Sequence, residues 1–224
     1  MKKRTKALLL VLCALMLVTT SVMGTVAYLT STADVANTFT VGDIAIKLDE
    51  TTVDADGKAV EPAARTEEGN KDVKLIPGRT ITKDPTVWVR EGSEPAYIRM
   101  KVTISNFAAL KSIFGESFLP QDYVEGWDKT TWVPTNDVAI DSTKDTATYE
   151  FRYKSVYDAT PDDNDNADDF DKLPALFQTF TLPGEKVDNA ALEKLKGLNI
   201  TVVAEAIQAE TFDDANAAWA AFGR

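Results

Sequence analysis

The chain has 224 residues, of which 44% are hydrophobic, so one large domain or two small ones with a sizeable core can form. Its formal net charge is −11, and such an acidic surface repels nucleic acid and anionic lipid. Histidine is absent and Cys13 is the single cysteine, which excludes a Ser-His-Asp triad, a Cys-His pair and an H-E-x-x-H zinc site. We therefore expect a protein that is not an enzyme and that has no nucleic-acid partner.

The first 27 residues have the pattern of a secretory signal peptide. Four basic side chains precede an uncharged apolar run over residues 7–18, and small and hydroxyl residues then lead to Ala27. The run has 12 residues, whereas crossing a bilayer takes roughly 20, so we favour a cleaved signal over a permanent membrane anchor. We predict cleavage between Ala27 and Tyr28, and membrane contact only through the uncleaved signal. Cleavage removes four basic residues and no acidic one, which leaves 197 residues with a net charge of −15.

The segment after the predicted cleavage site changes character near residue 38. Residues 28–37 have few core-forming side chains, which in isolation predicts a flexible N-terminal tail. Residues 38–50 predict a strand, because apolar residues recur at every second position. The alternation changes parity at Gly42-Asp43, which indicates a bulge or a bend.

The clearest predicted strand covers residues 96–105. Its even-numbered positions are all apolar, which is typical of a half-buried strand in an antiparallel sheet. Before it, residues 51–72 predict a mobile loop with at most a small hairpin, residues 73–76 a short strand and residues 81–90 a longer one. After it, residues 106–118 predict a short amphipathic helix.

The second half of the chain continues this alternation of strands and short helices. Strands are predicted at residues 138–141, 147–157, 176–182 and 198–208. The last of these is largely apolar, which predicts burial on both faces. Helices are predicted at residues 189–198 and from Thr211 onward, where Thr211 or Asp213 is the candidate N-cap. Together these patterns predict a single all-β, antiparallel sandwich domain over residues 28–224 with short appended helices.

Four segments carry a resemblance through their sequences and their order: GTVAYLTSTADVANTFTVGDIAIKLDE, LIPGRTITKDPTVWVREGSEPAYIRMKV, LFQTFTLPGE and ITVVAEAIQAETFDDANAAWAAF. They cover most of the exported chain and resemble the TasA/camelysin family, whose members are processed by a SipW-type signal peptidase. The resemblance implies a jelly-roll β-sandwich and a fibre-forming or surface-associated role in the extracellular biofilm matrix. Part of the camelysin branch is labelled metallopeptidase, and the absence of histidine argues against that activity here.

An acidic loop over residues 158–171 is the candidate metal site. Its carboxylates repel one another unless solvent or a cation screens them, and calcium takes roughly six to eight oxygen ligands. Residues 162–166 match the start of an EF-hand loop, but Ala167 and Leu173 replace the required glycine and bidentate glutamate. A solvated loop without a cofactor and a calcium site both remain open. The candidate ligands are Asp162, Asp163, Asp165, Asp168 and Asp169.

Aromatic and acidic side chains provide two further candidate sites. The aromatics either pack in the core and on the sheets or form a carbohydrate-stacking face. A glycosidase needs one carboxyl with a raised pKa in apolar surroundings. Asp84 and Glu205 stand beside strand-like residues, and we expect both at sheet edges or on an exposed face. The aromatic candidates are Trp88, Tyr97, Trp127, Trp132, Tyr149, Tyr153 and Tyr157.

The N-terminal segment over residues 28–40 is the candidate for assembly. A sandwich has edge strands with unpaired backbone groups, to which a released segment of a neighbouring subunit can add as a strand. The family resemblance implies this donor-strand mode, whereas the residues alone show a short β-capable segment or an inert tail. The possible anchors are Tyr28, Val35 and Phe39.

These observations favour a secreted structural protein of the extracellular matrix or the cell surface. Its expected partners are copies of itself or related matrix proteins, together with a SipW-type signal peptidase. The alternative is a monomeric extracellular binding module for carbohydrate or protein. A third possibility, a camelysin-like secreted peptidase, is disfavoured because histidine is absent.

Overall fold

The structure is a computed structural model that describes residues 30–34, 37–40, 44–159 and 169–223. Its regular structure consists mainly of strands, every strand pair is antiparallel, and the helices are short. The prediction of an all-β fold is therefore confirmed. The predicted signal peptide, residues 1–27, lies outside the described residues.

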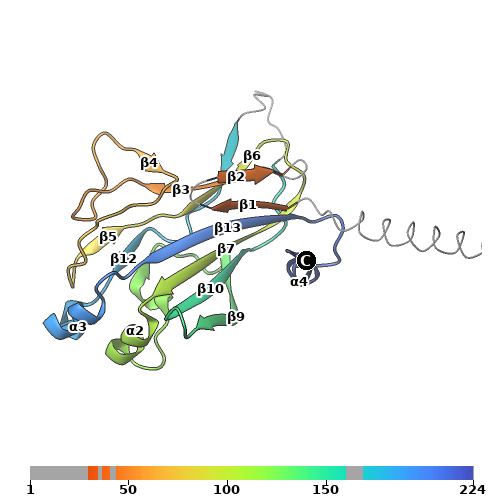
Figure 1. The fold of residues 1–224 in the computed structure, drawn as a ribbon. Coiled ribbons are helices and arrows are strands. Elements are labelled where there is room, and N and C mark those ends of the chain that lie inside the picture. Colours follow the sequence, from red (N-terminus) through yellow and green to blue (C-terminus); the bar gives the residue numbers. More distant parts are fainter. Residues whose placement is uncertain (1–29, 35–36, 41–43, 160–168, 224) are drawn as a thin grey trace, which may run out of the picture.

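The larger sheet has six strands, with β13 and β7 at its centre (Figure 1). The predicted alternation of β7 is confirmed, since its even-numbered side chains are buried on the inner face. The predicted hairpin of residues 138–141 with 147–157 is also present and is longer than expected. In spatial order the strands are β2 (Asn37–Thr40), β1 (Thr30–Asp34), β13 (Ile200–Gln208), β7 (Ala96–Ser105), β10 (Thr146–Tyr153) and β9 (Trp132–Asp141).

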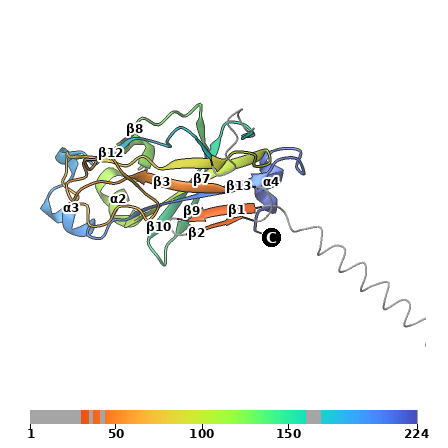
Figure 2. The same cartoon turned by 90° about the horizontal axis from the view of Figure 1, so that it is seen from above.

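A second layer faces the large sheet and consists of two smaller sheets (Figure 2). Apolar side chains of its strands form one continuous core with the inner faces of β7, β10 and β13. The four-stranded sheet contains β11 (Phe170–Lys172), β6 (Thr86–Arg90), β3 (Ile46–Thr51) and β4 (Arg65–Thr66). The three-stranded sheet contains β5 (Thr80–Thr82), β12 (Thr179–Thr181) and β8 (Val124–Glu125).

Short helices close the ends of the two layers (Figure 1). Asn106 precedes the first of them with φ 53°, and its side-chain amide donates to the carbonyl oxygens of Lys194 and Lys196 at 3.0 and 3.3 Å. This contact ties two predicted helices together. The helical elements are α2 (Phe107–Phe114), η1 (Pro120–Tyr123), η2 (Gly184–Lys186), α3 (Asn189–Lys194) and α4 (Ala215–Ala221). Within the described ranges, no helix has the length and apolar character needed to cross a bilayer.

The C-terminal helix begins later than predicted. Its N-cap is Asp214, whose carboxylate accepts a hydrogen bond from the backbone N–H of Ala217 at 2.8 Å. The predicted caps, Thr211 and Asp213, precede that position. Aspartate satisfies the free N–H groups of a first helical turn well, so three neighbouring candidates of similar propensity could not be ranked from sequence.

Residues 51–72 contain the small hairpin that the prediction allowed, with an antiparallel bridge between Val53 and Ala59, and side-chain hydrogen bonds hold the rest of the segment. The amide of Asn70 donates to Glu50 Oε1 at 2.9 Å and to the Thr51 carbonyl at 2.8 Å, and its Oδ1 accepts from the Val53 N–H at 2.8 Å. These hydrogen bonds hold the segment in place, although it lacks the periodic apolar residues of a buried strand or helix. The predicted strand at residues 73–76 is not a strand in the structure.

Candidate assembly site

The outer edge of β13 is only half covered by its neighbour. On one side β7 pairs with all nine residues from Ile200 to Gln208. On the other side β1 pairs with four, since Thr30 lies opposite Ile207 and Ala33 opposite Ala204. Within the described part of the chain, no strand pairs with residues 200–203 on this side. This stretch therefore presents backbone groups that a further strand can use.

A groove lies beside the uncovered half of β13. Two adjoining hollows of about 310 and 340 Å³ separate this stretch from the loops that follow β3 and β4. The groove wall is mixed, with acidic, basic and amide side chains beside apolar ones. The residues common to both hollows are Glu50, Asn70, Lys71, Lys83, Asn199 and Ile200.

The groove wall opposite β13 is held rigid by ion pairs and amide contacts. The carboxylate of Glu50 accepts hydrogen bonds from Lys83 Nζ at 2.6 Å and from the amide of Asn70 at 2.9 Å. Glu50 is buried, and its charge is compensated by these two donors. Because the wall is preorganised, an added strand would meet a fixed surface and would not have to order it.

A second ion cluster fixes β4 beneath the same wall. Arg65 donates to Asp49 Oδ1 and to Asp84 Oδ2, both at 2.8 Å. Burial raises the pKa of Asp84, but hydrogen bonds from Arg65 and Thr51 outweigh it and hold the pKa below its ordinary value. Asp84 is therefore half-buried in this cluster, and the alternative that placed it on an exposed face is wrong. A lowered pKa is also the opposite of what a general acid needs.

The outer face of β13 carries a buried ion cluster under α4. Glu205 is 8% exposed and accepts from Arg99 Nε at 2.5 Å and from Lys101 Nζ at 3.1 Å. The guanidinium of Arg99 also lies 4.1 Å from the centre of the Trp219 ring and bonds Glu150 at 2.9 Å. The predicted exposed position of Glu205 is wrong, because α4 covers this face of the sheet. Glu205 stands opposite Thr32 of β1 in the backbone register.

The N-terminal segment forms two strands on its own sheet, so the predicted flexible tail is a hairpin-like pair within its described residues. β1 pairs with β2 from Ser31–Thr40 to Asp34–Asn37, and Phe39 stands opposite Thr32 in this register. Threonine at positions 30 and 32 favours a strand, although the polar composition of the segment predicts a flexible tail. The predicted cleavage residues Ala27 and Tyr28 and the predicted anchor Val35 lie outside the described residues.

The candidate calcium site falls largely outside the described residues. Asp162, Asp163, Asp165 and Asp168 belong to the range 160–168, which the structure does not describe. Asp169 is described, and its carbonyl oxygen accepts from the backbone N–H of Glu91 at 3.0 Å. Among described residues, no group of three or more His, Cys, Asp or Glu side chains is placed to hold a metal ion. The calcium site therefore stays a prediction.

None of the seven candidate carbohydrate-stacking aromatics is exposed: two are buried and five are half-buried. Trp132 is fully buried and Tyr149 nearly so, while Tyr153 and Tyr157 meet edge to face at 5.8 Å. Trp88 lies on the second layer, with Lys47 Nζ 5.0 Å from its ring centre. The seven aromatics therefore do not form one exposed face.

Comparison with known protein families, with curated proteins and with solved structures found no match.

Proposed function

We propose that the chain is a secreted structural protein that assembles into extracellular fibres by exchanging its N-terminal segment between subunits. The observation that carries the proposal is the pairing of β1 with the edge of β13. This pairing uses backbone hydrogen bonds over four residues of β13, and the same side of β13 continues uncovered beside a preformed groove. A strand held in this way can leave its own sheet and be replaced by the same strand of another subunit.

If the register between β1 and β13 continued along β13, a strand from a neighbouring subunit would gain additional backbone pairs. Continuing the β1–β13 register would place residues 34–37 opposite residues 203–200. In the described monomer residues 37–40 instead pair with β1. An extended segment from a neighbour would keep the four existing pairs and add new ones in the groove. Such a head-to-tail contact does not close on itself, so it propagates a filament.

The sequence resemblance supports the finer parts of the proposal. The ordered segments similar to the TasA/camelysin family favour a jelly-roll sandwich, secretion to the matrix or cell surface, and partners that are further copies or related matrix proteins. Removal of residues 1–27 by a SipW-type peptidase would free the segment that begins at Tyr28. Processing would then control when assembly starts.

Cysteine exchange tests the proposal directly. Ala33 and Ala204 are register partners, and a disulfide suits directly opposed residues of two strands. Two exported chains are made, one with Ala33→Cys and one with Ala204→Cys, each also carrying Cys13→Ser. When they are mixed and oxidised, strand exchange predicts disulfide-linked heterodimers on a non-reducing gel. Monomers alone after long mixing at fibre-forming concentration would refute the exchange.

A second function, a monomeric binding module for carbohydrate or protein, is favoured by one observation. The groove beside β13 holds charged and amide side chains beside apolar ones in a preorganised wall, which also suits a sugar or an extended peptide. Concentration-dependent light scattering separates the two functions, because a binding module stays monodisperse. A casein-cleavage assay with and without chelator tests the peptidase alternative, for which we expect no activity.

A further inference from the structure

The groove wall brings an amine, a carboxylate and an amide together. They come from separate parts of the second layer: Glu50 from β3, Asn70 from the loop that follows β4, and Lys83 from the position that follows β5. Lys83 Nζ donates to Glu50 Oε2 at 2.6 Å, and Asn70 Nδ2 donates to Glu50 Oε1 at 2.9 Å. The two oxygens of one carboxylate therefore hold the amine beside the amide.

Backbone groups fix the orientation of the Asn70 amide. Its Oδ1 accepts from the N–H of Val53 at 2.8 Å, and its Nδ2 also donates to the carbonyl oxygen of Thr51 at 2.8 Å. These donors and acceptors identify which amide atom is the oxygen and which is the nitrogen. A donor aimed at a carbonyl oxygen stabilises the negative charge that develops there when a nucleophile attacks the carbon. The Val53 N–H is placed to do this for Asn70.

The amine and the carboxylate are shielded from solvent. The side chain of Glu50 is 8% exposed and that of Lys83 is 17% exposed. In such surroundings a neutral pair of amine and carboxylic acid costs less, relative to the ion pair, than it would in water. An amine that has lost its extra proton has a free electron pair and is a nucleophile. Shielding also limits the access of water, which would compete for the amide carbon.

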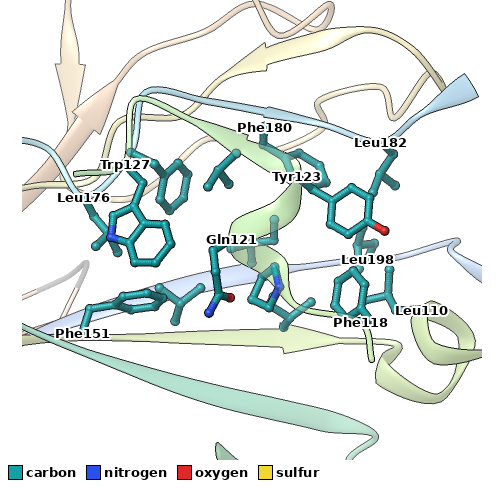
Figure 3. Close-up of a pocket in the computed structure, with 16 residues that line it drawn as sticks. Leu110, Phe118, Gln121, Tyr123, Trp127, Phe151, Leu176, Phe180, Leu182 and Leu198 are labelled. Atoms are coloured by element: carbon teal, nitrogen blue, oxygen red, sulfur yellow. The ribbon is translucent and has the colours of Figure 1, made fainter. Parts of the chain in front are cut away.

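The amide of Gln121 in η1 provides an internal comparison. Figure 3 shows it among apolar side chains between the layers, including Trp127, Phe118 and Phe151. The described residues that line this space include neither a lysine nor a carboxylate. Apolar surroundings alone therefore give an amide no partner for a reaction, whereas Asn70 has both an amine and a proton carrier beside it.

We propose that Lys83 and Asn70 become joined by a covalent amide bond, which the folded chain forms itself with Glu50 as the proton carrier. Glu50 takes a proton from Lys83, and the neutral Nζ attacks Cγ of Asn70 while Oδ1 takes up the negative charge beside the Val53 N–H. Glu50 then passes its proton to Nδ2, the bond between Cγ and Nδ2 breaks, and ammonia leaves. The new bond joins Nζ to Cγ. Nζ gives up one more proton, which the ammonia carries away as ammonium, so the balance needs no oxidant and no other reactant.

This bond would fasten the groove wall without a disulfide. Cys13 is the single cysteine and lies within the predicted signal peptide, so the exported chain would have no thiol to oxidise. A bond between residues 70 and 83 closes a loop that contains β5. Closing a loop removes conformations from the unfolded chain and so favours the folded one. Strand exchange at β13 does not require this bond, so either can be absent without the other.

Mass spectrometry of the purified, exported full chain tests the bond. With the N-terminus determined on the same sample, the intact mass should lie below the sequence mass by one molecule of ammonia. Trypsin should not cleave after Lys83, because its side chain has become an amide, and the digest should contain a branched peptide that joins Lys83 to Asn70. An intact mass equal to the sequence mass would overturn the proposal.

Substitutions of two neighbouring lysines separate this bond from other losses of ammonia. Lys83→Arg keeps a cation for Glu50 but removes the amine, so this variant should keep its full mass. Lys71 lines the same hollows without bonding Glu50, and Lys71→Arg is the matched control that should still lose ammonia. Loss of ammonia that persists in Lys83→Arg would mean that Asn70 reacts with its own backbone, which would also overturn the proposal.

Glu50→Gln tests the proton carrier, because glutamine has the same size and cannot take up the proton. This variant should keep its full mass while circular dichroism shows an intact sheet. A cross-link that still forms in Glu50→Gln would remove Glu50 from the reaction. The bond itself is decided by the parent chain and by Lys83→Arg, so the test does not depend on how Glu50→Gln folds.

Discussion

The two edges of the large sheet are built in opposite ways. At one edge β9 pairs with β10 with a register shift between Tyr149 and Phe151, and Pro134 lies at the shift. Proline has no N–H to offer a further strand, and an irregular register bends the edge away from a partner. Toward the other edge, β13 keeps one continuous register with β7 over nine residues, and the strand pair β1–β2 covers only part of its other side. One edge is blocked by its own sequence, and the other is closed by the segment for which we propose exchange between subunits.

The β13 edge proposed for assembly is not the surface with the most exposed apolar side chains. Ile140 on β9 is 59% exposed and Val138 is 39% exposed, more than any aliphatic side chain of β13. Yet β9 also carries Asp137 and Asp141, whose charges oppose edge-to-edge pairing. What distinguishes the β13 edge is the backbone of residues 200–203, which no described strand pairs on this side, and not exposed apolar side chains.

Removal of β1, which covers half of the β13 edge, should have the largest effect on fibre formation. Deletion of residues 28–37 from the full chain removes β1, so secreted protein should fold but form no fibres, as seen by negative-stain microscopy. The free β13 edge should accept a synthetic peptide of residues 28–40, which restores a strand but not a filament. Fibres of normal appearance in the deletion variant would show that assembly uses another surface.

Loss of the buried carboxylate under α4 should be the next largest effect. Glu205→Gln leaves Arg99 and Lys101 without their shared counter-ion, which should lower the free energy of unfolding by about 3 kcal/mol. Denaturant unfolding measures this change. Lys101→Met is the matched control and should cost less, because Glu205 keeps its bond to Arg99. A cost below about 1 kcal/mol for Glu205→Gln would mean that the cluster does not support β13.

Lowering the pH should reduce the free energy of unfolding, because it protonates Asp84, which holds Arg65 beneath the groove wall. Since its folded pKa lies below the unfolded value of about 3.9, its contribution is complete above that pH and is lost as the pH falls through the folded pKa. At pH 7, Asp84→Asn should cost about 1–2 kcal/mol of unfolding free energy. The difference from the parent should shrink below about pH 4. The exposed Glu68→Gln controls for net charge, and a pH-independent difference would contradict the assignment.

The smallest effect is expected at the blocked edge. Ile140→Lys changes an exposed side chain of β9, so stability should change by less than about 0.5 kcal/mol and fibres should form as before. Light scattering and unfolding curves measure both. Loss of fibres in this variant, with stability unchanged, would move the assembly surface to β9.

The elements with local periodicity were predictable from sequence, and those held by distant partners were not. The alternation of residues 96–105 and the turn after Asp141 act within a few residues, so β7 and the β9–β10 hairpin could be predicted. β1 has no apolar alternation, and its pairing depends on β13, which lies more than 160 residues further along the chain. Its position on its own sheet therefore could not be read from residues 28–37 alone.

The site residues divide in the same way. Glu205 was noticed as an acid in an apolar strand, but its burial depends on Arg99 and on α4, and neither contact leaves a local pattern. Asn70 and Arg65 stand in a stretch without periodicity, and the contacts they make decide the shape of the groove.

The antiparallel register between β1 and β13 has a mechanical consequence. Hydrogen bonds in such a ladder run perpendicular to the strands. In a fibre joined by this pairing, tension along the strands would load all of the bonds at once in shear and would not open them one after another. A joint of a few residues would then resist pulling along the fibre far better than peeling from its side.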